Sequence, residues 1–206
     1  MKKILTLLAL GGSLCATQAA VTLNSTNFGN GLVSADNSPL ATGSLRFGVF
    51  PAIFDFAANS ANLPALEAAF VQVYAYTGAI NAFATDGFFS ISQSVDNTAS
   101  FEGQSYASSI AGQKIYLWAQ NVGATQQAIF STSTTWNSGV GLPPFESNFS
   151  PDTGAPGLTA HIGDLAAGRD LGAGAPSHRL AVVVPEPGVG LTVVMGGLAL
   201  LVRRRR

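Results

Sequence analysis

The sequence predicts a single, mainly β domain of the β-sandwich type, with one short helix, in the middle of a chain of 206 residues. First, several segments alternate apolar and polar residues with a period of two, as half-buried strands do. Second, the middle of the chain is rich in Gly, Ser, Thr and Asn and poor in Lys and Glu, which disfavours helices. Third, all 19 aromatic residues lie between Phe28 and Phe149, so this region can fill a core.

Six segments carry the strand pattern. In residues 42–50, Leu45 and Phe47 face one side while Ser44 and Arg46 face the other. The other five, in chain order, are VTLNS (21–25), FFSISQSV (88–95), KIYLWAQN (114–121), QAIFSTS (127–133) and HRLAVVV (178–184). The short connection NVGATQ predicts that 114–121 and 127–133 pair as a hairpin. VTLNS is expected to open the sheet and HRLAVVV to close it.

One segment, residues 62–73, is predicted to be helical. Asn62 is a suitable N-cap and Pro64 suits the first turn, while Leu66, Phe70 and Val73 recur at helical spacing. The Pro- and Gly-rich stretch 139–177 is expected to be a long, irregular excursion.

The charge of the chain is unevenly distributed. Residues 20–184 hold four basic and ten acidic residues, a formal charge of −6, whereas the basic residues cluster at both ends. A mildly acidic domain without a basic stripe is a poor nucleic-acid binder, so no nucleic-acid partner is expected. Cys15, the one cysteine, lies near the N-terminus, and without that segment the chain has no disulfide or thiol ligand.

Residues 1–19 have the three parts of a secretory signal peptide. Lys2 and Lys3 precede an apolar run, and Thr17 and Ala19 are the small residues expected before a cut between Ala19 and Ala20. A retained anchor is the alternative, but the run is short for a membrane span, which needs about 20 residues. Lipidation at Cys15 is disfavoured because Leu14 precedes it.

The C-terminal segment, residues 185–206, combines three features. Pro185, Glu186 and Pro187 are followed by 15 uncharged residues, 188–202, and then by four arginines, Arg203, Arg204, Arg205 and Arg206. As a helix the uncharged run would be about 22 Å long, a marginal membrane span. Clustered arginines stay on the cytoplasmic side, so the preceding domain is predicted to lie outside. This agrees with export by the signal peptide.

Residues 184–206 resemble the PEP-CTERM sorting signal of bacterial exported proteins. The resemblance implies that exosortase, a membrane-embedded transpeptidase-like enzyme, reads Pro185, Glu186 and Pro187 and removes the tail. It also implies delivery to the cell surface in species that make exopolysaccharide and biofilm. A plain C-terminal anchor with a fortuitous Pro-Glu-Pro is the alternative.

Candidate catalytic groups are few. His161, Asp164 and Asp170 lie close in sequence, with Asp152 upstream, but their spacing matches no known metal or hydrolase motif. The chain has no G-x-S-x-G elbow. Glu67, Glu102 and Glu146 are the candidates for a glycosidase pair, although nothing in the sequence places two together. The turns SVDNTAS and SPDTGAP carry Asp residues that suit calcium or ordinary turns.

Exposed aromatic residues would offer a further function, stacking on sugar rings. Tyr116 and Trp118 are predicted to share a strand face, and Trp136 follows in a polar loop. Core packing is the commoner role of such residues.

The sequence thus predicts an exported, exosortase-processed surface or matrix protein without catalytic residues, metal or cofactor. Signal peptidase and exosortase are its expected processing enzymes, and an envelope component or exopolysaccharide its expected partner. The tail helix is expected to hold it in the membrane transiently. A secreted polysaccharide hydrolase is the alternative.

Overall fold

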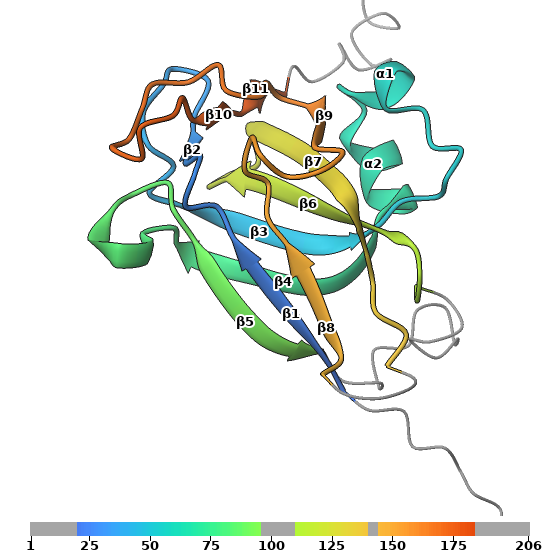
Figure 1. The fold of residues 1–206 in the computed structure, drawn as a ribbon. Helices are drawn as coiled ribbons and strands as arrows, with labels where there is room; N and C mark the ends of the chain where they lie inside the picture. The colour runs from blue at the N-terminus through green and yellow to red at the C-terminus, as the bar shows by residue number, and fades with distance from the viewer. Residues whose placement is uncertain (1–19, 96–109, 140–143, 184–206) are drawn as a thin grey trace, which may run out of the picture.

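The computed structural model describes residues 20–95, 110–139 and 144–183 (Figure 1). These residues form a mainly β domain with few helices, which confirms the predicted class. The strands are β1 (Val21–Thr26), β2 (Leu32–Val33), β3 (Thr42–Val49), β4 (Val71–Ala79), β5 (Ser90–Val95), β6 (Lys114–Asn121), β7 (Gln126–Thr135), β8 (Glu146–Phe149), β9 (Thr159–Ile162), β10 (His178–Arg179) and β11 (Ala181–Val182). The helices are α1 (Phe56–Asn59), α2 (Leu63–Ala69) and the 3₁₀ turn η1 (Ala82–Ala84).

The larger sheet is antiparallel, in the order β11-β7-β6-β3-β4, with β9 also paired to β7. The predicted hairpin is present, because β6 and β7 pair directly across the turn at residues 122–125. The register of β3 against β4 shifts beside Gly48, where an added Cβ would lie 2.0 Å from the carbonyl oxygen of Val71. Gly48 therefore permits the close approach of the two strands at this bulge.

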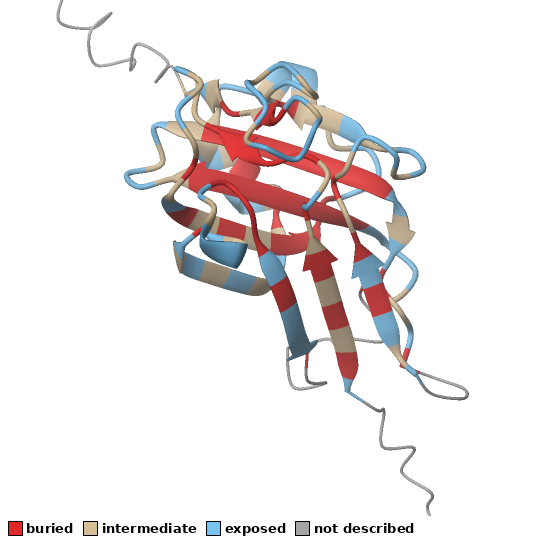
Figure 2. Cartoon of the chain, turned by 60° about the vertical axis from the view of Figure 1, so that its left-hand side comes forward, coloured by how far each residue is buried: buried red, intermediate tan, exposed pale blue. Residues whose placement is uncertain are grey.

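The smaller sheet has the order β5-β1-β8, with β1 and β8 parallel. Its inward side chains, among them Leu23, Ile91 and Phe149, share one core with Leu45 and Phe47 of the larger sheet. Figure 2 shows the strands of the smaller sheet striped by burial, as expected when one face packs on a core and the other faces water.

The central strands of the larger sheet, β6 and β7, are buried on both faces. A second apolar cluster, on the face away from the smaller sheet, joins Trp118 and Ile129 to Leu66 of α2 and to Phe50 and Phe70. Residues 115–120 of β6 are all buried, so this strand appears continuously red in Figure 2. The helices thus form a third layer, which the period-two pattern of β6 did not reveal.

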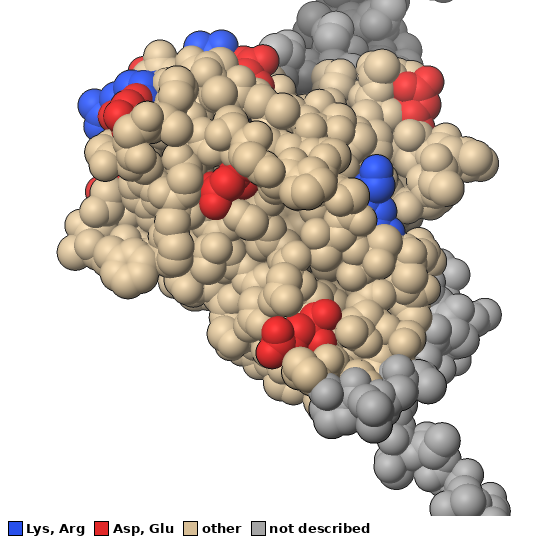
Figure 3. All heavy atoms as spheres, in the orientation of Figure 1, with Lys and Arg blue, Asp and Glu red and all other residues tan. Residues whose placement is uncertain are grey.

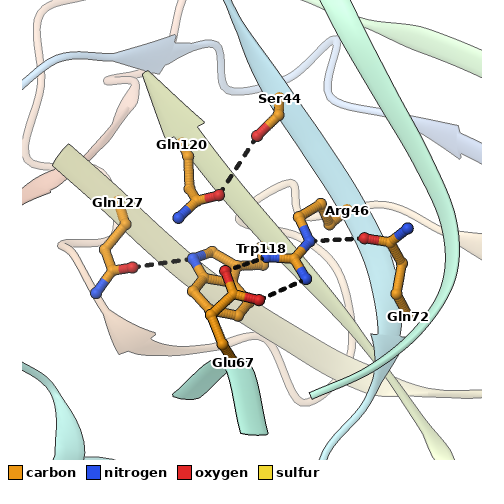
Figure 4. A network of polar contacts seen from close by, with 7 residues as sticks. All are labelled: Ser44, Arg46, Glu67, Gln72, Trp118, Gln120 and Gln127. Carbon is orange, nitrogen blue, oxygen red and sulfur yellow. Dashed lines mark hydrogen bonds and ion pairs between the residues drawn. The ribbon is translucent and has the colours of Figure 1, made fainter. Parts of the chain in front are cut away.

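A polar network lies within this second cluster (Figure 4). Arg46 makes two hydrogen bonds to Glu67, of 2.6 and 2.9 Å, and its guanidinium carbon lies 4.6 Å from the Trp118 ring centroid. The Trp118 indole N–H donates to Gln127 Oε1 at 3.0 Å. These contacts fasten α2 onto the larger sheet and explain why Arg46, on a strand face that the sequence left open to water, is only 16% exposed in its side chain.

The helix prediction is correct at its start and wrong at its end. Asn62 caps α2 by accepting a hydrogen bond from Ala65 N, but the helix ends at Ala69. Phe70 is already extended, and Val73 belongs to β4, where it packs on the core between the sheets. The spacing of Phe70 and Val73 is compatible with either a helix or the start of a strand. The pairing of β4 with β3 favours the strand.

The structure also contains elements that the sequence did not predict. The short helix α1 precedes α2, with Asp55 as its N-cap. The stretch 139–177, expected to be irregular, contributes β8 to the smaller sheet and β9 to the larger. Residues 178–184 were expected to form one closing strand, but the described part is split into β10 and β11, which pair with β2 and β7.

Buried polar side chains join the long loops. His178 is fully buried; its Nδ1 accepts a hydrogen bond from Ala166 N at 3.0 Å and its Nε2 bonds to the carbonyl oxygen of Pro151. This arrangement requires a neutral ring with the proton on Nε2. Burial lowers the pKa of His178, and the Pro151 carbonyl and Asp152 oppose that effect only in part.

The folded protein is therefore expected to lose stability on mild acidification. Because the pKa of His178 is lower in the folded protein than the ordinary value near 6.5, the unfolded chain binds more protons below that pH. The free energy of unfolding should be highest above about pH 6.5 and fall until the pH passes the lowered pKa. Urea unfolding at a series of pH values between about 7.5 and 5 measures this, and a flat profile would contradict the buried neutral ring.

Candidate functional site

The aromatic residues that the sequence offered for sugar stacking are not on the surface. Trp118 is 0% exposed, Trp136 1% and Tyr116 9%. Trp118 and Tyr116 do share a strand face, but α1, α2 and the residues beside them cover it, and Phe50 packs edge-on against Tyr116. That interpretation is wrong, because the face that seemed free is the second core.

The candidate histidine and aspartates do not come together. His161 Nε2 lies 2.8 Å from Ser131 Oγ, and its ring stacks on Phe56 at 4.2 Å. Asp164 pairs with Arg179 at 2.7 Å, and Asp170 accepts hydrogen bonds from the backbone of its own turn. Each side chain thus has separate partners.

The Ser131 and His161 pair has the spacing of a nucleophile and its base. Ser131 is, however, 0% exposed within β7, so a substrate carbonyl has no access to its oxygen. Burial and the nearby Lys114 also lower the pKa of His161. The pair fits a structural contact between β7 and β9.

The acidic residues are also dispersed. Glu67 is paired with Arg46, and Glu146 begins β8 in the smaller sheet; Glu102 lies outside the described residues. Asp152 accepts hydrogen bonds from the backbone N–H groups of Gly29 and Asn30 at 3.0 and 2.9 Å, so it organises a loop. Across residues 20–95, 110–139 and 144–183, no three His, Cys, Asp or Glu residues are grouped to hold a metal ion.

A candidate binding site is a groove at one edge of the domain, between β4 of the larger sheet and β5 of the smaller sheet. We call it the β4–β5 groove; its volume is about 320 Å³. It is lined by Tyr74, Tyr76, Ala79, Asn81, Ala82, Phe88, Phe89, Ser90, Ile91, Ser92 and Gln93. In Figure 1 β5 runs along the lower left of the domain, and β4 crosses the middle of the view just below β3.

The two tyrosines form the aromatic side of the groove. Their register opposite Phe47 and Leu45 of β3 turns them toward the smaller sheet, and both are half-buried. The hydroxyl group of Tyr76 donates to the carbonyl oxygen of Ala79 at 2.8 Å, which fixes the ring at the end of the strand. The groove therefore presents held aromatic rings that still reach solvent.

The other side of the groove is polar and uncharged. Ser90, Ser92 and Gln93 are exposed on β5, and Ser92 donates to Asn24 at 2.8 Å. None of the lining residues carries a charge. Figure 3, in the view of Figure 1, shows an acidic group lower on the smaller sheet, outside the residues that line the groove. The site can offer amide and hydroxyl hydrogen bonds beside an aromatic wall.

The sorting residues predicted from the sequence lie outside the residues that the structure describes. Pro185, Glu186, Pro187 and Arg203 to Arg206 belong to residues 184–206, and Ala19 precedes Ala20, the first described residue. In the described part of the chain, no helix has the length and apolar character of a membrane span.

Comparisons with protein-family models, with curated proteins and with solved structures found no match.

Proposed function

We propose that the chain is an exported bacterial surface or matrix protein of the PEP-CTERM type, whose non-catalytic β-sandwich domain binds a neutral polysaccharide in the β4–β5 groove. The uncharged groove with an aromatic wall is the observation that carries the binding role. The proposed location outside the cell rests on the two terminal segments, residues 1–19 and 185–206.

The N-terminal and the C-terminal segments both indicate that residues 20–184 lie outside the cytoplasm. A signal peptide over residues 1–19 sends residues 20–184 across the membrane, and Arg203 to Arg206 hold the far end of the tail in the cytoplasm. Pro185, Glu186 and Pro187 are the proposed recognition site of exosortase, which would remove the tail and release the domain to the surface.

The chemistry of the groove matches that of a sugar chain. A sugar ring has an apolar C–H face that packs on an aromatic ring and hydroxyl groups that bond to amides and hydroxyls. Tyr74 and Tyr76 offer the first kind of contact, and Asn81, Ser90 and Gln93 the second. Because no cation lines the groove, a neutral glycan fits better than an acidic one. The separate partners of the described carboxylates give no support to the hydrolase alternative.

Replacing both tyrosines, Tyr74→Leu with Tyr76→Leu, is expected to weaken glycan binding by about tenfold, since ~1.4 kcal/mol of ring contact would be lost. Leucine keeps much of the apolar volume that packs on the core. Thr77→Ala, an exposed change on the opposite face of the same strand, is the matched control. Binding is measured on a glycan array with the full chain in a detergent that contains no sugar.

The wild type and the control should give the same signals on neutral glycans, and those of the tyrosine variant should be reduced. Equal signals from all three proteins, or no neutral glycan bound by any of them, would refute the binding role. Circular dichroism of the variants confirms that their fold is retained.

A further inference from the structure

A second aromatic feature lies next to the β4–β5 groove. Phe83 is 78% exposed and Phe28 39%, and their ring centroids are 4.7 Å apart. Phe28 follows β1, whereas Phe83 lies in η1, the turn that leads from β4 toward β5. Two large apolar side chains from distant parts of the chain thus meet in water. We call them the Phe28–Phe83 pair.

The backbone that carries Phe83 is strained. Phe83 and Ala84 have φ values of 55° and 58°, in the left-handed region that non-glycine residues avoid. The turn is held by hydrogen bonds from Ala82 N to Phe88 O and from Gly87 N to Ile80 O, both of 2.8 Å. The fold thus keeps a bulky aromatic residue where both water exposure and backbone geometry disfavour it. Strain of this kind is typical of binding sites.

The pair is continuous with the groove. It borders a hollow of about 250 Å³ whose lining includes Phe28, Phe83, Phe88 and Leu171. Ala82 and Phe88 line both this hollow and the β4–β5 groove, so the two adjoin at η1. The lining of the hollow is also uncharged. In Figure 1 the turn projects at the left of the domain, beside β4 and β5.

We infer that the Phe28–Phe83 pair is an outer stacking subsite for the same neutral glycan, so that the protein binds a chain several sugars long across η1. This inference rests on the proposed function of the groove. A sugar at the outer subsite places an apolar face on Phe83, while its neighbours along the chain occupy the groove. The neutral lining of both hollows is what favours a glycan as the occupant of the pair.

The test compares a disaccharide with a hexasaccharide in the gluco-, galacto- and manno-oligosaccharide series, by calorimetry on the full chain in a sugar-free detergent. The variant is Phe83→Gly, which removes the ring and accepts the left-handed backbone. The matched control is Ala84→Gly, which alters the neighbouring left-handed position and keeps the ring. Phe83→Gly should weaken hexasaccharide binding about tenfold. The disaccharide affinity should be unchanged, and Ala84→Gly should resemble the wild type with both ligands.

Equal hexasaccharide affinities for Phe83→Gly and the wild type would overturn the outer subsite. The double variant Tyr74→Leu with Tyr76→Leu then tests separately whether the β4–β5 groove binds the glycan. A dimer in sedimentation that Phe83→Gly abolishes would overturn it in favour of a second copy of the chain. Binding to lipid vesicles that depends on Phe83 would overturn it in favour of a membrane surface. If neither oligosaccharide in any series binds the wild type, the proposed function fails and the subsite with it.

Discussion

Replacing Trp118 with alanine is expected to lower the free energy of unfolding by about 3–5 kcal/mol. The side chain is 0% exposed and meets Phe70 edge-on with the ring centroids 5.3 Å apart. The guanidinium carbon of Arg46 lies over the Trp118 ring, 4.6 Å from its centroid, and Gln127 accepts the hydrogen bond of the indole N–H. The alanine variant would leave a cavity between the larger sheet and α2, and Gln127 Oε1 would lose its hydrogen-bond donor.

Equilibrium unfolding in urea, followed by circular dichroism, measures this loss. Trp118→Phe keeps most of the ring but removes the N–H donor, so it should cost less, about 1–3 kcal/mol for the unpaired Gln127 oxygen. Val122→Ala, at a position that is 72% exposed, should change stability by less than about 0.5 kcal/mol. An alanine variant at position 118 that is as stable as the Val122 control would show that α2 does not close a second core.

Replacing Pro185, Glu186 and Pro187 with alanines is expected to block tail removal and leave the protein in the membrane fraction. The change removes the proposed recognition site but leaves the apolar run and all four arginines, so membrane insertion should be retained. The measurement is the share of the protein in membrane, surface and medium fractions of a host that has exosortase.

Two controls accompany this experiment. The wild-type chain in a host without exosortase should stay in the membrane fraction, as the alanine variant does. Thr77→Ala, an exposed change in β4, should fractionate like the wild type. Release of the alanine variant at the wild-type level would favour another sorting route and remove the role of the tripeptide.

Most strands were predictable because their local pattern and their tertiary environment agree. In β1, β3 and β5 the apolar residues alternate and face the core between the sheets, as in Leu23, Phe47 and Ile91. The sequence did not separate α2 from β4, since Phe70 and Val73 fit a helical spacing as well as a strand. Only the pairing of β4 with β3, a contact between segments distant in the sequence, decides between them.

The candidate site was harder to predict than the fold. Tyr74 and Tyr76 fall directly after the expected helix, and the groove requires β4 and β5 to lie on neighbouring edges of two different sheets. Conversely, Trp118 appeared available because a strand pattern does not show whether a helix covers its polar-looking face. One signal was present: the alternation of Val73, Ala75 and Thr77 with Tyr74 and Tyr76 continues past the helical residues and indicates a strand.

The intact mass of the protein recovered from the surface and medium of an exosortase-containing host tests the central claim most directly. The claim predicts a chain that begins at Ala20 and lacks Arg203 to Arg206 together with the apolar run before them. A surface protein that retains Met1, or one whose mass includes the C-terminal arginines, would contradict processing at that end.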